Sequence, residues 1–202
     1  MNKPIFDYRL YLITDGQPDL IRRTEAALKG GVTCVQYREK SKSIDEMIAQ
    51  ATELKALCHQ YHVPLFINDY IDIAREVGAD GIHLGQSDET VQVARAVLGD
   101  IPIGVSACTV DEAMTAQSQG AAYVGVGAMF PTISKDDATL VTMEVAEKIK
   151  KAIQIPSLLI GGISLNTVEE ITAPYDGLCV ISAILSARSP LEAARKLKKY
   201  TV

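Results

Sequence analysis

Eight short apolar segments recur along the 202-residue chain, and a segment with helical periodicity follows each of them. The apolar segments are rich in β-branched residues and lie at residues 9–14, 32–38, 63–68, 81–84, 101–106, 122–127, 157–160 and 177–182. Strands that alternate with helices form parallel sheets, because each helix returns the chain to the edge where the next strand starts. Eight such units predict a closed (β/α)8 TIM barrel of the α/β class.

The helical segments lie between these strands, at residues 19–29, 44–62, 71–77, 89–98, 110–119, 143–152, 165–172 and 190–200. The clearest is 44–62, where an apolar stripe is formed by Ile44, Met47, Ile48, Ala51, Leu54 and Leu57. Ser43 precedes this stripe and Glu46 follows three residues later, which predicts a capping box at the start of the helix.

The length of the chain suits one barrel and no second domain. Eight units in 202 residues leave about 25 residues for each, which is near the practical minimum for this fold. We therefore expect a single domain over residues 1–202. An open, doubly wound sheet is the main alternative, but residues 14–18 (TDGQP) after the first strand lack the glycine pattern of a dinucleotide-binding turn.

Charge and hydropathy exclude several kinds of partner. The net charge of −5 disfavours nucleic acid, whose phosphates require a basic surface. The sequence has no apolar run of about 18 residues and no apolar core typical of a signal peptide near its start. The four cysteines form no CxxC pair and suit a reducing compartment. We expect a cytoplasmic protein with no nucleic-acid or membrane partner, either a monomer or a small homo-oligomer.

Polar residues gather at the carboxyl ends of the predicted strands, where barrel enzymes carry their active sites. Gln36, Arg38 and Lys40 alternate at the end of the second strand, so we expect all three side chains to face the barrel mouth. Two cations and an amide suit a phosphate or a diphosphate. The alternative is a solvated strand end in which Arg38 pairs with a carboxylate.

Two carboxylates follow the third and fourth strands. Asp69 and Asp88 would lie at neighbouring strand ends, and such hard oxygen ligands suit Mg²⁺. The alternative is that each caps the helix that follows it. We expect His83, on the fourth strand, to be an interior residue with a hydrogen-bonded ring and not a metal ligand.

The fifth strand ends at Ser106, which could donate to a phosphate oxygen or cap the following helix. Thr109 is the better placed residue for capping. Cys108 lies between them, but no base near it in the sequence could activate the thiol as a nucleophile.

The last three units offer a loop and a flexible backbone. Residues 128–140 form the longest loop on this face, with two hydroxyl side chains and Lys135, and could close over a substrate or remain a mobile surface loop. Gly161 and Gly162 after the seventh strand allow the backbone to approach an anion closely, and Ser182 ends the eighth strand beside them.

These segments together resemble thiamine phosphate synthases over nearly the whole chain. The resemblance rests, in chain order, on YLITD (11–15), QYREK (36–40), ND (68–69), HLGQSD (83–88), GVS (104–106), GVG (125–127), FPT (130–132), SK (134–135), IGGI (160–163) and ISAI (181–184). Enzymes of that family join 4-amino-5-hydroxymethyl-2-methylpyrimidine diphosphate to 4-methyl-5-(2-hydroxyethyl)thiazole phosphate and release pyrophosphate.

The resemblance also implies roles for particular residues. It implies that the pyrimidine diphosphate is held by Gln36, Arg38, Lys40 and Asn68, with Ser106 and Lys135 completing the diphosphate pocket. It implies Mg²⁺ at Asp69 and Asp88. The thiazole phosphate would contact Thr132, Ser134 and the backbone of Gly162, Ile181 and Ser182. The implied mechanism is dissociative: pyrophosphate leaves first, and no side-chain nucleophile is needed.

The sequence departs from the family at Cys108, where many members have His, and at Ser134, where Thr is common. Residues 136–143 also lack the usual glycine. A related thiazole tautomerase, thought to use a His at the position of Cys108, is one alternative, and a non-catalytic ligand-binding barrel is another. The synthase is favoured over the tautomerase by Asn68, Asp69, Asp88 and Lys135.

Overall fold

A computed structural model describes residues 6–132 and 139–201. Its strands form a closed barrel in the order of the chain, and every neighbouring pair is parallel. The strands are β1 (Leu10–Ile13), β2 (Cys34–Tyr37), β3 (Leu65–Asn68), β4 (Gly81–Leu84), β5 (Ile103–Ala107), β6 (Tyr123–Val126), β7 (Ser157–Ile160) and β8 (Gly177–Val180). The predicted (β/α)8 barrel is confirmed.

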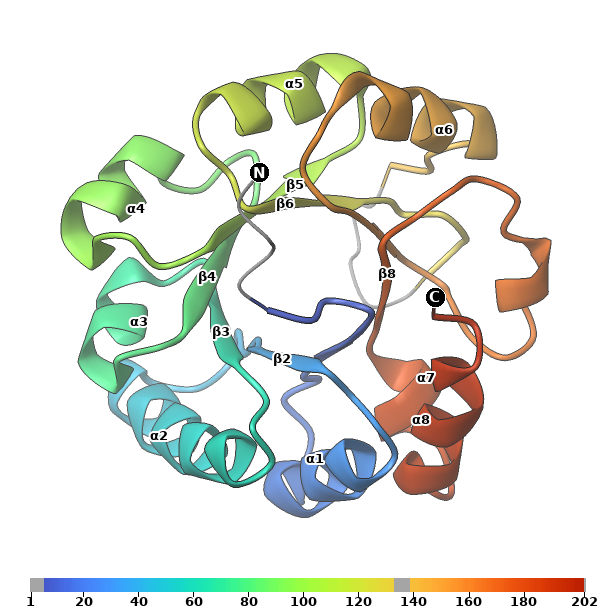
Figure 1. Ribbon diagram of the computed structural model, residues 1–202. Helices are drawn as coiled ribbons and strands as arrows, with labels where there is room; N and C mark the ends of the chain where they lie inside the picture. Colours follow the sequence, from blue (N-terminus) through green and yellow to red (C-terminus); the bar gives the residue numbers. More distant parts are fainter. Residues whose placement is uncertain (1–5, 133–138, 202) are drawn as a thin grey trace.

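Helices surround this barrel (Figure 1). They are α1 (Leu20–Lys29), α2 (Ile44–Gln60), α3 (Ile71–Val77), α4 (Val91–Leu98), α5 (Val110–Ser118), α6 (Met143–Ala152), α7 (Ser182–Leu185) and α8 (Pro190–Lys198). The capping box of Ser43 and Glu46 is confirmed at the start of α2, although Ile44 is exposed and lies outside the buried stripe. Within residues 6–132 and 139–201, every helix is too short or too polar to cross a membrane.

The seventh unit differs from the prediction, because the segment 165–172 contains only one 3₁₀ turn, Val168–Glu170. Hydroxyl side chains compete with helix formation here. Ser164 N donates to Thr167 Oγ1 at 3.0 Å, and that hydroxyl donates to Gly162 O at 2.9 Å. Pro174 closes the segment, and proline disfavours a helical conformation at the residue before it.

Two cores follow from the alternation of side chains along each strand. Outward residues such as Leu12 pack against the helices. Inward residues form a smaller aromatic cluster, in which the rings of Tyr11, Phe66 and Tyr123 lie with centroids 5.7–5.9 Å apart. A Cβ at Gly104 would lie 2.1 Å from the Tyr123 ring, so glycine is needed to admit that ring. The cluster fills the barrel and leaves polar residues at the strand ends.

Candidate active site

The turn after β2 carries Arg38 and Lys40, which lie beyond the end of the strand at Tyr37. The Thr14 side chain bonds both backbone groups of Arg38. Its hydroxyl accepts from Arg38 N at 2.8 Å and donates to Arg38 O at 3.0 Å. Gln36 is still on the strand, is buried, and donates through Nε2 to the Tyr11 hydroxyl at 3.1 Å. Gln36 therefore points into the barrel interior. The prediction that strand alternation also directs Arg38 and Lys40 is wrong, because β2 ends at Tyr37 and the turn positions these two cations.

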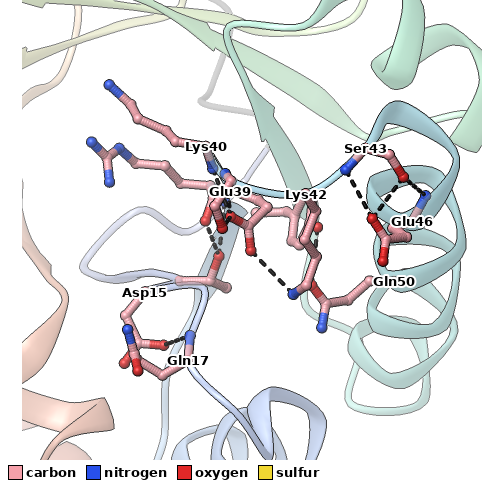
Figure 2. A network of polar contacts seen from close by, with 12 residues as sticks. Asp15, Gln17, Glu39, Lys40, Lys42, Ser43, Glu46 and Gln50 are labelled. Carbon is pink, nitrogen blue, oxygen red and sulfur yellow. Dashed lines mark hydrogen bonds and ion pairs between the residues drawn. The ribbon is translucent and has the colours of Figure 1, made fainter.

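Glu39 organises this turn, a role that the strand alternation did not indicate. Its buried carboxylate accepts from the backbone N and hydroxyl of Ser41 and from Lys40 N at 2.7–2.8 Å, and it pairs with Lys42 at 3.1 Å. Lys42 also donates to Gln50 of α2 at 2.8 Å. Burial raises the pKa of Glu39, but these hydrogen bonds outweigh it and lower the pKa to about 2. Figure 2 shows the Lys40 side chain extending away from this network.

Asp69 and Asp88 meet at the ends of β3 and β4. Asp69 follows β3 with a left-handed φ of 63°, and its N donates to His83 O at 2.9 Å. Asp88 accepts from Gly85 N at 2.6 Å. Burial, a hydrogen bond to Asp88 and the charge of Asp88 raise the pKa of Asp69 to about 6, against the lowering effect of Lys40 and Arg38. Asp69 therefore lies within electrostatic reach of Asp88 and of both cations of the β2 turn.

Neither carboxylate caps a helix, so that alternative is wrong. The residue that precedes α3 is Tyr70, and α4 is capped by Thr90, whose hydroxyl accepts from Val93 N at 3.3 Å. Both carboxylates instead line an open cleft of about 410 Å³ with Tyr70, Ser87 and Glu89.

The donor set of this cleft fits Mg²⁺. The part of the chain that the structure describes holds no group of three or more His, Cys, Asp or Glu side chains arranged around a metal, so a closed zinc-type site is not formed there. Mg²⁺ commonly takes one or two carboxylates and completes its coordination with water and substrate phosphate. Asp69 and Asp88 provide the two carboxylates beside an open space.

The interior of the barrel below the cleft contains His83 and Ser106. His83 bonds through Nδ1 to the Tyr123 hydroxyl and through Nε2 to the Ser106 hydroxyl, each at 3.0 Å, which confirms an interior residue with a hydrogen-bonded ring. Asn68 is buried, and it is the register partner of His83 in the pairing of β3 with β4. Helix α5 is capped by Thr109 as predicted, so Ser106 is not needed as a cap.

Cys108 lies just after β5 and is half-buried. Its Sγ donates to Gly127 O at 3.2 Å, and its backbone N donates to Glu112 at 2.6 Å. The first contact joins the ends of β5 and β6, and the second joins the end of β5 to α5 (Val110–Ser118), so both suit a structural residue.

The loop after β6 packs on the glycines after β7. Met129 N donates to Ile160 O at 2.9 Å, and Phe130 N donates to Gly161 O at 3.0 Å. A Cβ at Gly162 would lie 2.7 Å from both Phe130 Cβ and Pro131 O, and its φ of 65° also favours glycine. The two glycines therefore let the loop that carries Thr132 lie against the end of β7.

The end of β8 differs from the prediction in one respect. Strand β8 stops at Val180, and Ser182 is the first residue of helix α7, with Ile181 immediately before it. The short helix turns the chain at the mouth, so Ser182 lies at a helix start and not on a strand.

The predicted site residues thus form two groups on neighbouring strand ends. The first group, from β2 to β5, contains Gln36, Arg38, Lys40, Asn68, Asp69, Asp88 and Ser106. The second group, from β6 to α7, contains Thr132, Gly162, Ile181 and Ser182. Ser134 and Lys135 lie outside the described residues.

A comparison with protein families matches residues 10–184 to the family model described as thiamine monophosphate synthase. The chain belongs to this family. A thiamine-phosphate synthase of Clostridium acetobutylicum is 46% identical over 195 residues, which cover 94% of this chain and 92% of that protein. One from Methanobrevibacter smithii is 43% identical over 198 residues, covering 96% and 95% of the two chains.

A solved structure agrees with this family at the level of the fold. The thiamine phosphate pyrophosphorylase of Pyrococcus furiosus superposes with a TM-score of 0.90 at 34% identity, and the match covers 96% of this chain and 95% of that one. The family, the barrel and the polar residues at its mouth are therefore consistent with one another.

Proposed function

We propose that this chain synthesises thiamine phosphate by joining 4-amino-5-hydroxymethyl-2-methylpyrimidine diphosphate to 4-methyl-5-(2-hydroxyethyl)thiazole phosphate. The observation that carries the proposal is that Arg38 and Lys40 follow β2 while Asp69 and Asp88 follow the neighbouring strands β3 and β4, so that all four lie at one barrel mouth in a chain of this family. Cations beside a carboxylate pair suit a substrate that carries a diphosphate and a divalent cation together.

The first group of residues would hold the pyrimidine diphosphate. Arg38 and Lys40 would neutralise its phosphates, with Lys135 of the loop and the Ser106 hydroxyl as further donors. Gln36 and Asn68 would contact the substrate from inside the barrel, since both lie buried near its mouth. Glu39 holds the backbone of this turn in place through its hydrogen bonds, so that the Arg38 and Lys40 side chains would extend to the ligand.

Asp69 and Asp88 would hold Mg²⁺ through their carboxylate oxygens. When bound, Mg²⁺ supplies positive charge that stabilises the departing diphosphate. The raised pKa of Asp69 fits this role, because a half-buried carboxyl beside a second acid gains from a cation that replaces its proton.

The reaction would be dissociative. The bond between the methylene carbon and the diphosphate oxygen breaks first, and its electron pair leaves with the diphosphate. The thiazole nitrogen then forms the new carbon–nitrogen bond with its lone pair. Arg38, Lys40 and Lys135 would stabilise the leaving charge, and the remaining residues would position the two rings. No step needs a nucleophile from the protein, which agrees with the structural contacts of Cys108.

The second group would bind the thiazole phosphate. Thr132 and Ser134 would donate hydroxyls, and the backbone at Gly162, Ile181 and Ser182 would offer N–H groups. The packing of the β6 loop on Gly161 and Gly162 brings Thr132 to the same edge of the mouth as the start of α7.

Three cysteines, Cys34, Cys58 and Cys179, are buried as thiols, which suits a reducing compartment. We propose that the enzyme acts in the cytoplasm as a monomer or small homo-oligomer, without a nucleic-acid or membrane partner. Its partners are small phosphorylated substrates.

The direct test is an assay of the purified protein with both substrates and Mg²⁺, with thiamine phosphate identified by mass. We expect thiamine phosphate only when both substrates are present. Isomerised thiazole phosphate without coupling would instead assign the tautomerase activity. Saturable binding of either substrate without turnover would assign a non-catalytic barrel. Either of these results would overturn the proposal.

A further inference from the structure

A continuous chain of hydrogen-bonded side chains crosses the barrel interior from Gln36 to Ser106. Gln36 Nε2 donates to the Tyr11 hydroxyl at 3.1 Å, and the Tyr11 and Tyr123 hydroxyls lie 2.8 Å apart. The Tyr123 hydroxyl lies 3.0 Å from His83 Nδ1, and His83 Nε2 lies 3.0 Å from Ser106 Oγ. Both ends of this chain belong to the proposed diphosphate site, but its three middle residues have no part in the mechanism above.

The middle residues are held rigidly. Tyr11 and Tyr123 are buried, and the His83 ring stacks on the Tyr123 ring with centroids 5.6 Å apart and planes at 26°. A Cβ at Gly125 would lie 3.3 Å from His83 Cε1, so the residue facing His83 leaves little free space. Burial and neighbouring groups raise the pKa of both tyrosines well above the usual value, so their hydroxyls keep their hydrogens.

The donors and acceptors fix a direction along this chain. The Tyr11 oxygen accepts from Gln36 in either direction. If the Tyr11 hydrogen points to the Tyr123 oxygen, the Tyr123 hydrogen points to His83 Nδ1, and both hydroxyl hydrogens have an oxygen or nitrogen acceptor. The opposite direction would leave Tyr11 with the Cys34 sulfur as acceptor, which is a weaker one. A buried hydroxyl without a good acceptor is costly, so the first direction is favoured.

We infer that His83 is a positioning residue whose ring is held by Tyr123 with its hydrogen on Nε2, so that Ser106 presents its own hydrogen to the diphosphate. A His83 ring that accepts at Nδ1 carries its hydrogen on Nε2 and donates it to Ser106 Oγ. Ser106 then keeps its hydrogen for an acceptor at the mouth. With the other tautomer, Ser106 would donate to His83 and would offer only lone pairs to an anion. The inference deepens the proposed function and rests on it for the identity of the ligand.

The first test reads the tautomer without using activity. Two-bond ¹H–¹⁵N correlation spectra distinguish a ring hydrogen on Nδ1 from one on Nε2. The protein has three histidines, so the signal that disappears in a His83→Gln variant is that of His83. We expect the Nε2–H form in the wild type and a shift towards a mixture in Tyr123→Phe. A wild-type His83 in the Nδ1–H form would overturn the inference whether or not the protein couples the two substrates.

The second test asks whether Tyr123 acts through Ser106. We expect Tyr123→Phe to lower kcat of coupling by about tenfold, the effect of one misdirected hydrogen bond to a charged group, with little change in KM. In a Ser106→Ala background the same substitution should cause no further loss. His83→Gln, which keeps a donor near the Nε2 position, should retain more activity than His83→Leu.

Tyr8→Phe is the matched control, because Tyr8 packs in the same aromatic cluster at 4.8 Å from the Tyr123 ring and contributes no hydroxyl to this chain of hydrogen bonds. It should leave kcat and the His83 tautomer unchanged. Equal losses from Tyr8→Phe and Tyr123→Phe, or a full further loss in the Ser106→Ala background, would contradict the inference. A wild type without coupling activity would count against the proposed function, and the tautomer measurement would then decide this inference alone.

Discussion

Asp69 is the residue whose ionisation depends most clearly on its surroundings at the mouth. Burial and Asp88 raise its pKa to about 6. A carboxyl whose pKa is higher in the folded than in the unfolded protein stabilises the fold below the unfolded pKa, and that stabilisation is lost as the pH rises through about 6. Near neutral pH the ionised pair is therefore unfavourable until a cation binds.

The apparent affinity for Mg²⁺ should consequently depend on pH. A proton competes with the metal for Asp69, so we expect the affinity to be nearly constant above pH 7 and to fall as the pH drops through about 6. Calorimetric titration of Mg²⁺ between about pH 7.5 and pH 5 measures this dependence. Equal affinity over the whole range would show that Asp69 is not a ligand.

Asp69→Asn should remove Mg²⁺-dependent turnover while the fold survives. Asparagine tolerates the left-handed φ of 63° better than alanine does, so this variant isolates the loss of charge. Without Mg²⁺ at neutral pH, its midpoint of thermal unfolding should be higher than that of the wild type, because the acid pair is gone. Asp72→Asn removes a highly exposed carboxylate of α3 and is the control. Full activity of Asp69→Asn would overturn the metal assignment.

Single residues were predictable where strand alternation decides their direction. Gln36, His83 and Ser106 were assigned to the barrel interior or mouth, and the structure places them there. Glu39 was not recognised, because its importance comes from hydrogen bonds made after the strand has ended. Alternation says nothing about side chains that fold back on their own turn.

The β2 turn is the element on which the site most depends. Glu39 binds two backbone N–H groups, one hydroxyl and Lys42, and Lys42 joins the turn to α2 through Gln50. This network holds the segment between Arg38 and Lys40, and its disruption should therefore affect both stability and substrate binding.

Glu39→Gln should lower the free energy of unfolding by about 2 kcal/mol, because an amide cannot accept all of these bonds and loses the charge that pairs with Lys42. It should also raise KM for the pyrimidine diphosphate. Denaturant unfolding and steady-state kinetics measure the two effects. Glu53→Gln, at an exposed position on α2, is the control, and indistinguishable behaviour of the two variants would contradict this role.

Helices and strands were predicted well where apolar periodicity is strong and poorly where hydroxyl side chains control the backbone. The segment 165–172 has apolar residues at helical spacing, but Ser164 and Thr167 bond the local backbone and leave one 3₁₀ turn. Helix α7 was missed for a different reason. Its four residues, Ser182–Leu185, are too short to show a period and continue the apolar run of β8.

At the scale of the whole molecule, the net charge of −5 is a poor guide to the substrate. Acidic side chains are spread over the chain, whereas Arg38 and Lys40 are brought towards Asp69 by the parallel pairing of β2 with β3. The count of eight units in 202 residues was enough to predict the closure of the barrel. The gathering of these acids and cations at one mouth was also expected, because their segments follow neighbouring strands, but the detailed geometry of the turns after β2, β3 and β4 was not.

The central claim is that coupling takes place at this mouth, and Arg38 tests it most directly. The measurement is kcat/KM for thiamine phosphate formation by Arg38→Ala, compared with Arg22→Ala, whose side chain is 78% exposed on α1. Loss of a donor to the departing diphosphate should cost Arg38→Ala at least about 2 kcal/mol of transition-state stabilisation, or about thirtyfold in kcat/KM, while Arg22→Ala keeps the wild-type value. Equal values of kcat/KM for the two variants would contradict the account.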